Sequence, residues 1–272
     1  MRAGLPALLA ALAAATIAPS LPAQSAWLSP TPPPAIRIVR ETAQFGTAAA
    51  HLANERAWVN TLRSKKVPIS YVGTVAASGA PQFWFIGGAA SFAALGSLDG
   101  LYQGNQSLMK QLDTLMAREA KFVLDVQTTL LAYRADLSHR PLFIAPETRH
   151  FWVTIFHVRP GQDEAFNAVM GEYVRAYDAA QIAMPWVTYQ LMAGGDQPAF
   201  YLFVPMESYA GIDQDLQNMV TVGKQFPSPA DLIAKTSASV ERMETQVLTI
   251  SPQISYVPKD FADEDKEFWE AK

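Results

Sequence analysis

The chain has 272 residues, a formal net charge of −4 at pH 7 and no cysteine. The lack of cysteine excludes disulfides, thiolate metal sites and a cysteine nucleophile. A mildly acidic chain without a stripe of Lys and Arg also argues against nucleic acid as the main partner. The length is sufficient for two domains of ordinary size, each with its own packed core.

Residues 1–23 have the pattern of a secretory signal peptide. Arg2 supplies a positive charge, residues 5–17 are apolar, and Leu21-Pro-Ala precedes a cleavage point at Gln24. A membrane anchor is the alternative, but a spanning helix needs about 20 apolar residues and three prolines crowd this segment. We therefore expect export to the periplasm or the medium, with no stable membrane insertion once the signal is removed.

The remaining chain indicates a duplication. Residues 24–35 are a proline-rich leader that we expect to be stiff, extended and outside the core. Segments of residues 36–138 then recur in residues 153–255 at a distance of 117 positions: Pro68-Ile-Ser-Tyr-Val matches Pro185-Trp-Val-Thr-Tyr, and Pro81-Gln-Phe-Trp-Phe-Ile matches Pro198-Ala-Phe-Tyr-Leu-Phe. Residues 139–152 connect the two repeats, and residues 256–272 form an acidic tail with aromatic residues.

Each repeat is predicted to contain the same elements in the same order. Strands are expected where β-branched and aromatic residues cluster, and helices where apolar residues recur at spacings of three and four. The first repeat gives strands at 36–40, 69–75, 82–86 and 129–133, with helices at 47–63 and 108–126. The second gives strands at 151–158, 186–192, 199–204 and 247–250, with one helix from Pro160 and another at 231–243.

This order, β-α-β-β-α-β, is that of a ferredoxin-like unit, in which both helices cover one face of an antiparallel sheet. The other face needs a cover, and two units in one chain can cover each other. The predicted fold is therefore α+β, with two tandem ferredoxin-like units packed sheet to sheet.

Three segments of the second repeat form a distinctive pattern: Val153-Thr-Ile-Phe-His-Val-Arg-Pro-Gly-Gln-Asp-Glu-Ala-Phe166, Gly194-Gly-Asp196 and Phe200-Tyr-Leu-Phe-Val-Pro-Met-Glu-Ser208. The pattern resembles the dimeric α/β-barrel superfamily, in particular its NIPSNAP-like and antibiotic-biosynthesis-monooxygenase-like members, and the resemblance extends over residues 36–255. It implies an intramolecular dimeric α/β barrel with a small-molecule pocket between sheet and helices. Members of this superfamily differ widely in chemistry, and some use haem. The first repeat departs from the pattern, with Thr42-Ala-Gln-Phe in place of Arg159-Pro-Gly-Gln.

His157 and its neighbours are the first candidates for a site. His157 stands late in the first strand of the second repeat, beside Arg159, and its counterpart in the first repeat is Arg40. Because histidine titrates near neutral pH, it could shuttle a proton or bind haem iron. The alternative is a strand-end histidine hydrogen-bonded to a neighbouring loop.

Aromatic residues on the central strands are the second group of candidates. Trp186, Tyr189 and Tyr201 belong to the second repeat and Tyr71 to the first. Such side chains combine an apolar body with a polar tip, which suits a pocket for a flat or hydrophobic ligand. The alternative is ordinary packing of the sheet.

Polar residues of the first helix are the third group. Arg56 and Asn60 stand where the second repeat has Tyr173 and Tyr177, and as a buried pair they would bind an anionic group of a ligand. If the helix is rotated instead, both are exposed. The four histidines of the chain show no metal-ligand spacing, so the sequence predicts no metal site.

These features predict an exported protein that binds a small hydrophobic or aromatic molecule in a sheet–helix pocket and needs no cofactor. The pocket expected first lies in the second repeat, lined by His157, Trp186, Tyr189 and Tyr201. If the protein is an enzyme, a cofactor-independent monooxygenase or isomerase fits best, with His157 or Tyr189 handling protons. The alternatives are a haem-binding protein with His157 as axial ligand, and a non-catalytic module of the cell envelope that uses the tail. The sequence leaves open the ligand, the reaction and the formation of a homo-oligomer.

Overall fold

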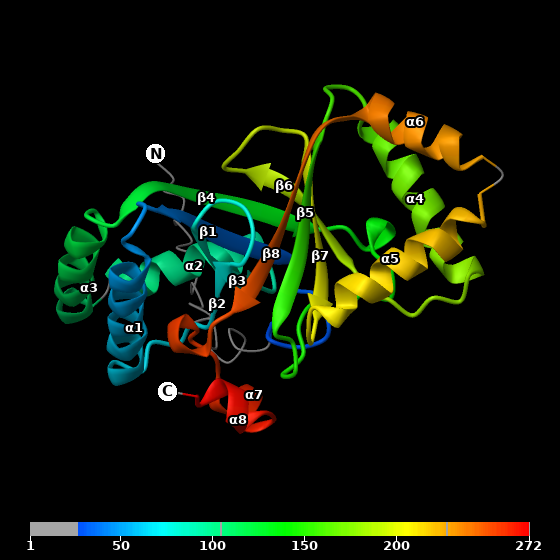
Figure 1. The fold of residues 1–272 in the computed structure, drawn as a ribbon. Helices are drawn as coiled ribbons and strands as arrows, with labels where there is room; N and C mark the ends of the chain where they lie inside the picture. Colours follow the sequence, from blue (N-terminus) through cyan, green and yellow to red (C-terminus); the bar gives the residue numbers. More distant parts are fainter. Residues whose placement is uncertain (1–26, 104, 227, 272) are drawn as a thin grey trace, which may run out of the picture.

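The computed structural model describes residues 27–103, 105–226 and 228–271 (Figure 1). The predicted signal peptide, residues 1–23, and the first part of the leader lie outside the described residues. Within the described ranges, none of the helices combines the length and the apolar composition needed to cross a membrane.

Two halves of the chain contain the same series of elements. The first half, residues 35–133, consists of β1 (Ala35–Ala43), α1 (Ala48–Ser64), β2 (Val72–Ala76), β3 (Gln82–Ala89), α2 (Phe92–Gln103), α3 (Gln106–Glu119) and β4 (Val123–Tyr133). The second half, residues 150–250, consists of β5 (His150–Val158), α4 (Asp163–Ala179), β6 (Val187–Ala193), β7 (Ala199–Met206), α5 (Ala210–Gly223), α6 (Pro229–Ser239) and β8 (Val240–Ile250). The β-α-β-β-α-β order has one helix between the third and fourth strands of each half, whereas the structure has two there, and β7 and β8 begin 117 positions after β3 and β4.

The eight strands close into one antiparallel barrel in the order β1-β3-β2-β8-β5-β7-β6-β4. The pairs β2–β8 and β4–β6 join the two halves. In Figure 1, α1 and α3 lie on the side of the first half and α4, α5 and α6 on the side of the second. The fold is therefore α+β, with helices outside a closed barrel.

Alternation along the strands separates the barrel interior from the helix-covered outer face. On β1, Ile36 and Ile38 point inward and belong to the main hydrophobic core, whereas Arg37, Val39 and Glu41 face outward toward the helices. The interior is filled mainly by aromatic and branched side chains, including Trp84, Phe143, Phe151, Tyr189 and Phe203. The barrel is thus packed, and any site between sheet and helices lies on its outer face.

The end of the leader is part of this core, which corrects the expectation that it lies outside. Trp27 and Leu28 are buried, and the Trp27 indole donates a hydrogen bond of 2.8 Å to the Ser70 hydroxyl. The Phe143 backbone N–H also donates to the carbonyl of Pro30 at 3.0 Å. An indole buries a large apolar area and still satisfies its N–H here, which outweighs the extended preference of the neighbouring prolines.

The strands β4 and β8 begin much earlier than predicted. Helices were expected to continue to residues 126 and 243, but both segments pair along their length with β1 and β5. Their outer residues are exposed, among them Leu124, Val126 and Met243, and the segments carry charged and polar residues that also occur in helices. Pairing with a long neighbouring strand decides the conformation where the local pattern is ambiguous.

The acidic tail docks on the barrel through two short helices, α7 (Lys259–Asp263) and α8 (Lys266–Trp269). Phe261 and Trp269 are buried against the main core, and the Trp269 indole donates a 2.9 Å hydrogen bond to the carbonyl of Pro146. The Arg149 guanidinium lies 3.9 Å from the centre of the Phe268 ring. The aromatic residues of the tail are therefore used within the chain.

Candidate functional site

The outer face of the first half contains a cavity of about 370 Å³ between the sheet and helices α1, α2 and α3, called the first-half cavity below. Its volume lies within the range of about 300–1,000 Å³ that is typical of small-molecule sites. Its lining combines apolar and aromatic side chains with polar and ionisable ones. The lining residues are Arg37, Val39, Glu41, Asn54, Glu55, Trp58, Ile69, Ser70, Tyr71, Phe85, Gly87, Leu95, Leu115, Met116, Glu119 and Thr128.

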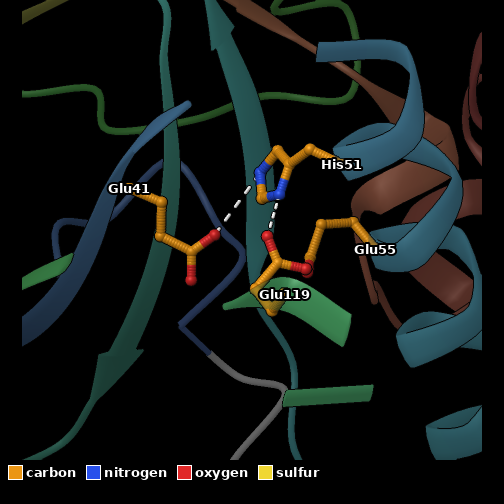
Figure 2. Close-up of side chains that lie close together, drawn as sticks. All are labelled: Glu41, His51, Glu55 and Glu119. Atoms are coloured by element: carbon orange, nitrogen blue, oxygen red, sulfur yellow. Dashed lines mark hydrogen bonds and ion pairs between the residues drawn. The ribbon is translucent and has the colours of Figure 1, made fainter. Parts of the chain in front are cut away.

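Three ionisable side chains of this lining, Glu41 on β1, Glu55 on α1 and Glu119 at the end of α3, lie close to the buried His51 of α1 (Figure 2). We call these four residues the acid–histidine cluster. His51 and Glu55 are four residues apart and so share one face of α1. Strand alternation turns Glu41 toward that face. The packing of α3 against α1 brings in Glu119, which is 68 residues from His51 in sequence.

The imidazole of His51 is fully buried and lies between two carboxylates, as Figure 2 shows. Its Nε2 is 3.4 Å from Oε2 of Glu41, and its Nδ1 contacts Oε1 of Glu119. The ring also packs edge-on against Phe83, with the ring centres 4.1 Å apart. The side-chain amide of Asn54 donates to Glu119 and, at 3.1 Å, to the backbone carbonyl of Leu115. These contacts fix the cluster between two helices and a strand.

The electrostatics of the cluster are unfavourable for three ionised carboxylates. Burial raises the pKa of the Glu41 carboxyl from 4.5 to about 7, although His51 opposes this effect and Glu119 adds to it. Burial likewise raises the pKa of Glu55 to about 9, and repulsion from Glu41 and Glu119 and a hydrogen bond with Glu119 add to this rise. Both shifts arise because a charge loses its hydration in the protein interior and neighbouring negative charges repel it.

Several buried polar atoms of the cluster have no hydrogen-bond partner within the described residues. They are Oε2 of Glu41, Nε2 of His51 and Oδ1 of Asn54. Buried polar atoms are nearly always paired in folded proteins, so three unpaired atoms in one place call for an explanation. One donor atom from each of the four cluster residues lies within 4.8 Å of the others, which is close enough for a shared metal ion.

Of the nine residues selected from the sequence, the structure places Tyr71 in the lining of the first-half cavity. Arg56 and Asn60 lie on another face of α1, where they line a separate, more open hollow of about 600 Å³ together with Tyr256 and Lys259. The first helix is therefore rotated relative to the buried-pair interpretation, and neither residue contributes to the first-half cavity.

The four residues expected to form a pocket in the second half are not brought together. Tyr189 and Tyr201 point into the barrel core, where the Tyr189 hydroxyl donates to the carbonyl of Pro33 at 3.1 Å and burial raises its pKa. Trp186 belongs to a different cluster and stacks on His139 with ring centres 4.7 Å apart. Strand alternation explains the separation, because an inward-facing residue cannot also line a sheet–helix pocket.

His157 lies at the end of β5 and faces the neighbouring strand β8. Its Nε2 is 3.1 Å from Oε1 of Glu244, and its Nδ1 is 3.5 Å from the guanidinium of Arg242. Both ring nitrogens are therefore engaged by charged neighbours, which does not fit an axial haem ligand. The structure instead agrees with the alternative of a strand-end histidine, although its partner is a strand rather than a loop.

Arg159, which follows His157 closely in sequence, and Arg40, the counterpart of His157 in the first repeat, lie in different surroundings. Arg159 is exposed, and its backbone N–H donates to the carbonyl of Ser239 at 2.8 Å. The guanidinium of Arg40 lies 5.4 Å from the centre of the Trp84 ring and donates to the side chain of Gln127. Neither arginine lines the first-half cavity.

No protein-family profile matches the sequence, and no curated protein matches it. Solved structures do match. A proposed monooxygenase from Fusobacterium nucleatum superposes with a TM-score of 0.52 at 11% identity, covering 80% of this chain and 92% of that one. An anthrone oxidase-like protein superposes with a TM-score of 0.50 at 12% identity, covering 82% and 93%. A chlorite dismutase from Candidatus Nitrospira defluvii gives a TM-score of 0.48 at 13% identity over 82% and 94%.

At these identities the likeness concerns the fold alone. The first two structures share with this chain the closed antiparallel barrel with helices outside it. Fold and site thus define an α+β protein with a closed antiparallel barrel and a buried acid–histidine cluster beside its sheet–helix cavity. Sequence reasoning missed Glu41, Glu55 and Glu119, and noted His51 without assigning it a role.

Proposed function

We propose that this protein binds a small aromatic molecule with a hydroxyl or carbonyl group in the first-half cavity and acts on it at the acid–histidine cluster. The observation that carries the proposal is that Glu41, Glu55 and Glu119 line the same cavity as Trp58 and Phe85. A ligand bound there therefore has an apolar wall along its body and ionisable groups at its polar end. Sites of this composition are typical of small-molecule binding.

The aromatic wall favours a flat molecule. Tyr71 and Phe85 pack edge to face with ring centres 5.9 Å apart, and Trp58 stands on the facing helix α1. A ring between the strand and helix residues would bury its faces against them, an arrangement that contributes beyond the burial of area alone. The polar end of the same molecule would then reach the cluster.

The chemistry we propose is removal of a proton from the bound molecule. A carboxylate oxygen or imidazole nitrogen in contact with a phenol or an activated C–H group can accept its proton. This step begins both the cofactor-independent oxygenase and the isomerase reactions. Because one structural neighbour is described as anthrone oxidase-like, anthrone is a suitable first probe, with 1-naphthol as a smaller one.

A fluorescence titration tests the proposal. Trp58 lines the cavity, so binding of anthrone or 1-naphthol should quench the emission of the parent protein more than that of Trp58→Phe. Val39→Trp fills the cavity from β1 and should weaken binding at least tenfold. Thr154→Trp is a matched control on β5, outside this cavity, and should leave the affinity within twofold. Equal affinity in the parent and Val39→Trp would refute binding in the first-half cavity.

Turnover is measured separately from binding. Oxygen uptake and the mass of the product, with anthrone as substrate, would establish an oxygenase, and a product of unchanged mass would establish an isomerase. Glu119→Gln should retain binding and lose turnover, because the substitution keeps the size of the side chain and removes the carboxylate. If the probes bind but are recovered chemically unchanged, the protein is a binding protein for them, and the catalytic part of the proposal is excluded for those probes.

Three expectations from the sequence also remain proposals. Export is tested by fusing residues 1–23 to a reporter and measuring its location. Descent of both halves from one ferredoxin-like unit is supported by the shared element order and the 117-residue spacing of β3 with β7 and β4 with β8. Formation of a homo-oligomer is tested by light scattering. A cell-envelope module that uses the tail has less support, since Phe261 and Trp269 are buried within the chain.

A further inference from the structure

We propose that Glu41, His51, Glu55 and Glu119 bind one divalent ion of the first transition series, such as Mn²⁺, Fe²⁺ or Zn²⁺. This inference goes beyond the proposed function, because the metal site depends on four side chains of the protein and not on the molecule that the cavity accepts. It is carried by three observations: the charge of the cluster, the spacing of its donor atoms and the unpaired atoms at its centre.

The charge of the cluster favours a cation. Three carboxylates and one imidazole are withdrawn from water in the wall of the cavity, and the His51 side chain is 0% exposed. Buried carboxylates are costly unless a positive charge or a shared proton offsets them. A single dication opposite three carboxylates offsets most of their negative charge, and an imidazole nitrogen can complete its coordination.

The spacing of the donor atoms fits one ion. One atom from each of the four residues can be chosen so that all lie within 4.8 Å of one another. Metal–oxygen and metal–nitrogen bonds of about 2.0–2.2 Å place opposite ligand atoms about 4.2 Å apart. Glu41 faces Nε2 of His51 and Glu119 faces Nδ1, so Glu119 has to rotate away from Nδ1 for all four side chains to bind one ion at Nε2.

The unpaired atoms provide an observation that is independent of the acidic character of the cluster. Nε2 of His51 and Oε2 of Glu41 are both buried and have no hydrogen-bond partner within the described residues, although they face each other at 3.4 Å. A fully buried imidazole nitrogen that makes no hydrogen bond is uncommon. A metal ion would satisfy such an atom, and Asn54, which donates to Glu119, would hold one ligand in position.

The donor set selects the class of metal. One imidazole nitrogen and three carboxylate oxygens suit Mn²⁺, Fe²⁺ and Zn²⁺. Mg²⁺ and Ca²⁺ prefer oxygen ligands alone. A chain without cysteine offers no thiolate for the softest ions. The alternative without a metal is a proton shared between Glu55 and Glu119, which the experiment below distinguishes.

The test is a metal titration of tag-free protein that has been dialysed against EDTA and then freed of chelator. Mn²⁺ is added and its free concentration is followed by electron paramagnetic resonance, in which bound Mn²⁺ loses the sharp six-line signal. We expect one Mn²⁺ per chain, and competition by Zn²⁺ for the same site. Glu41→Gln and Glu119→Gln should each weaken binding by more than about tenfold.

Glu244→Gln is the matched control, because Glu244 pairs with His157 at 3.1 Å on the opposite half of the barrel. It should bind Mn²⁺ as the parent does. Circular dichroism of each variant establishes that the fold is retained. Absence of stoichiometric binding to the parent, or equal affinity in the parent and both cluster variants, would overturn the proposal and leave the shared proton.

The metal titration and the ligand titration test the two proposals independently. Mn²⁺ binding is measured without any small molecule, so its failure leaves the first-half cavity as a binding site. Quenching by anthrone is measured with and without EDTA, so its failure leaves the metal site in place.

Discussion

Replacing Glu55 by glutamine should stabilise the metal-free protein at neutral and alkaline pH. The Glu55 carboxyl is buried, and its pKa is raised to about 9 from an ordinary value of 4.5. In the folded chain it therefore keeps its proton at pH 8, whereas in the unfolded chain it is ionised. Glutamine has nearly the same shape and can donate to Glu119 as the protonated acid does, but it has no proton to lose.

The size of the effect follows from proton linkage. Below pH 4.5 both states of the parent are protonated, so the raised pKa contributes its full stability. As the pH rises from 4.5 to about 9, the unfolded state releases a proton that the folded state keeps, and the parent loses about 1.4 kcal/mol of stability per pH unit from this group. The side chain of the Glu55→Gln variant does not titrate. The stability of Glu55→Gln minus that of the parent should therefore increase by roughly 3 kcal/mol between pH 6 and pH 8.

Urea unfolding in the presence of EDTA, followed by circular dichroism at several pH values, measures this difference. All other titrating groups are present in both proteins, so their contributions to the difference in stability largely cancel. This includes Glu41, because the side chain at position 55 is uncharged in the folded form of both proteins at these pH values. A difference in free energy of unfolding that stays constant from pH 6 to pH 8 would refute the reasoning, since it would mean that Glu55 ionises normally in the folded chain.

Three further substitutions test how other residues are used. Tyr189→Phe should cost about 1 kcal/mol, because the buried carbonyl of Pro33 loses its donor, while anthrone binding measured by fluorescence should not change. His157→Ala should cost less than about 1 kcal/mol, since its pair with Glu244 is partly exposed, and should leave Mn²⁺ affinity unaltered. Trp269→Ala should cost about 3–5 kcal/mol by removing a buried indole that holds the tail on the barrel, measured by urea unfolding. A loss of anthrone binding in Tyr189→Phe, a loss of Mn²⁺ binding in His157→Ala, or a Trp269→Ala protein as stable as the parent would contradict these assignments.

Much of the architecture follows from local patterns. A helix was predicted from Pro160 and begins at Asp163, where acidic residues stabilise its N-terminus. The hairpin at Gly194 was predicted and is observed, because glycine accommodates the φ of +93° there. The full extent of β4 and β8 was not predictable, since their outer residues are exposed and become strand only through pairing with β1 and β5. The burial of Trp27 was likewise not predictable, because its indole bonds to Ser70, 43 residues away in sequence.

The candidate site was likewise predictable only in part from local sequence, and the rest depends on tertiary contacts. One signal of the site is local in the sequence. His51 and Glu55 lie on the same face of α1 as the buried Val59 and Leu62, and ionisable side chains on such an apolar face need partners. No local signal identifies those partners. Glu41 belongs to the site because barrel alternation turns it outward, and Glu119 because α3 packs on α1.

The sequence by itself determined the order of most elements and the α+β class, because propensity and periodicity act over a few residues. Only the tertiary structure decided which aromatic residues enter the core, which face of α1 meets the sheet and which charged side chains share a cavity. Contacts such as that of His51 with Glu119 join residues distant in the chain. Their energies depend on burial, which is a property of the folded molecule and not of any segment.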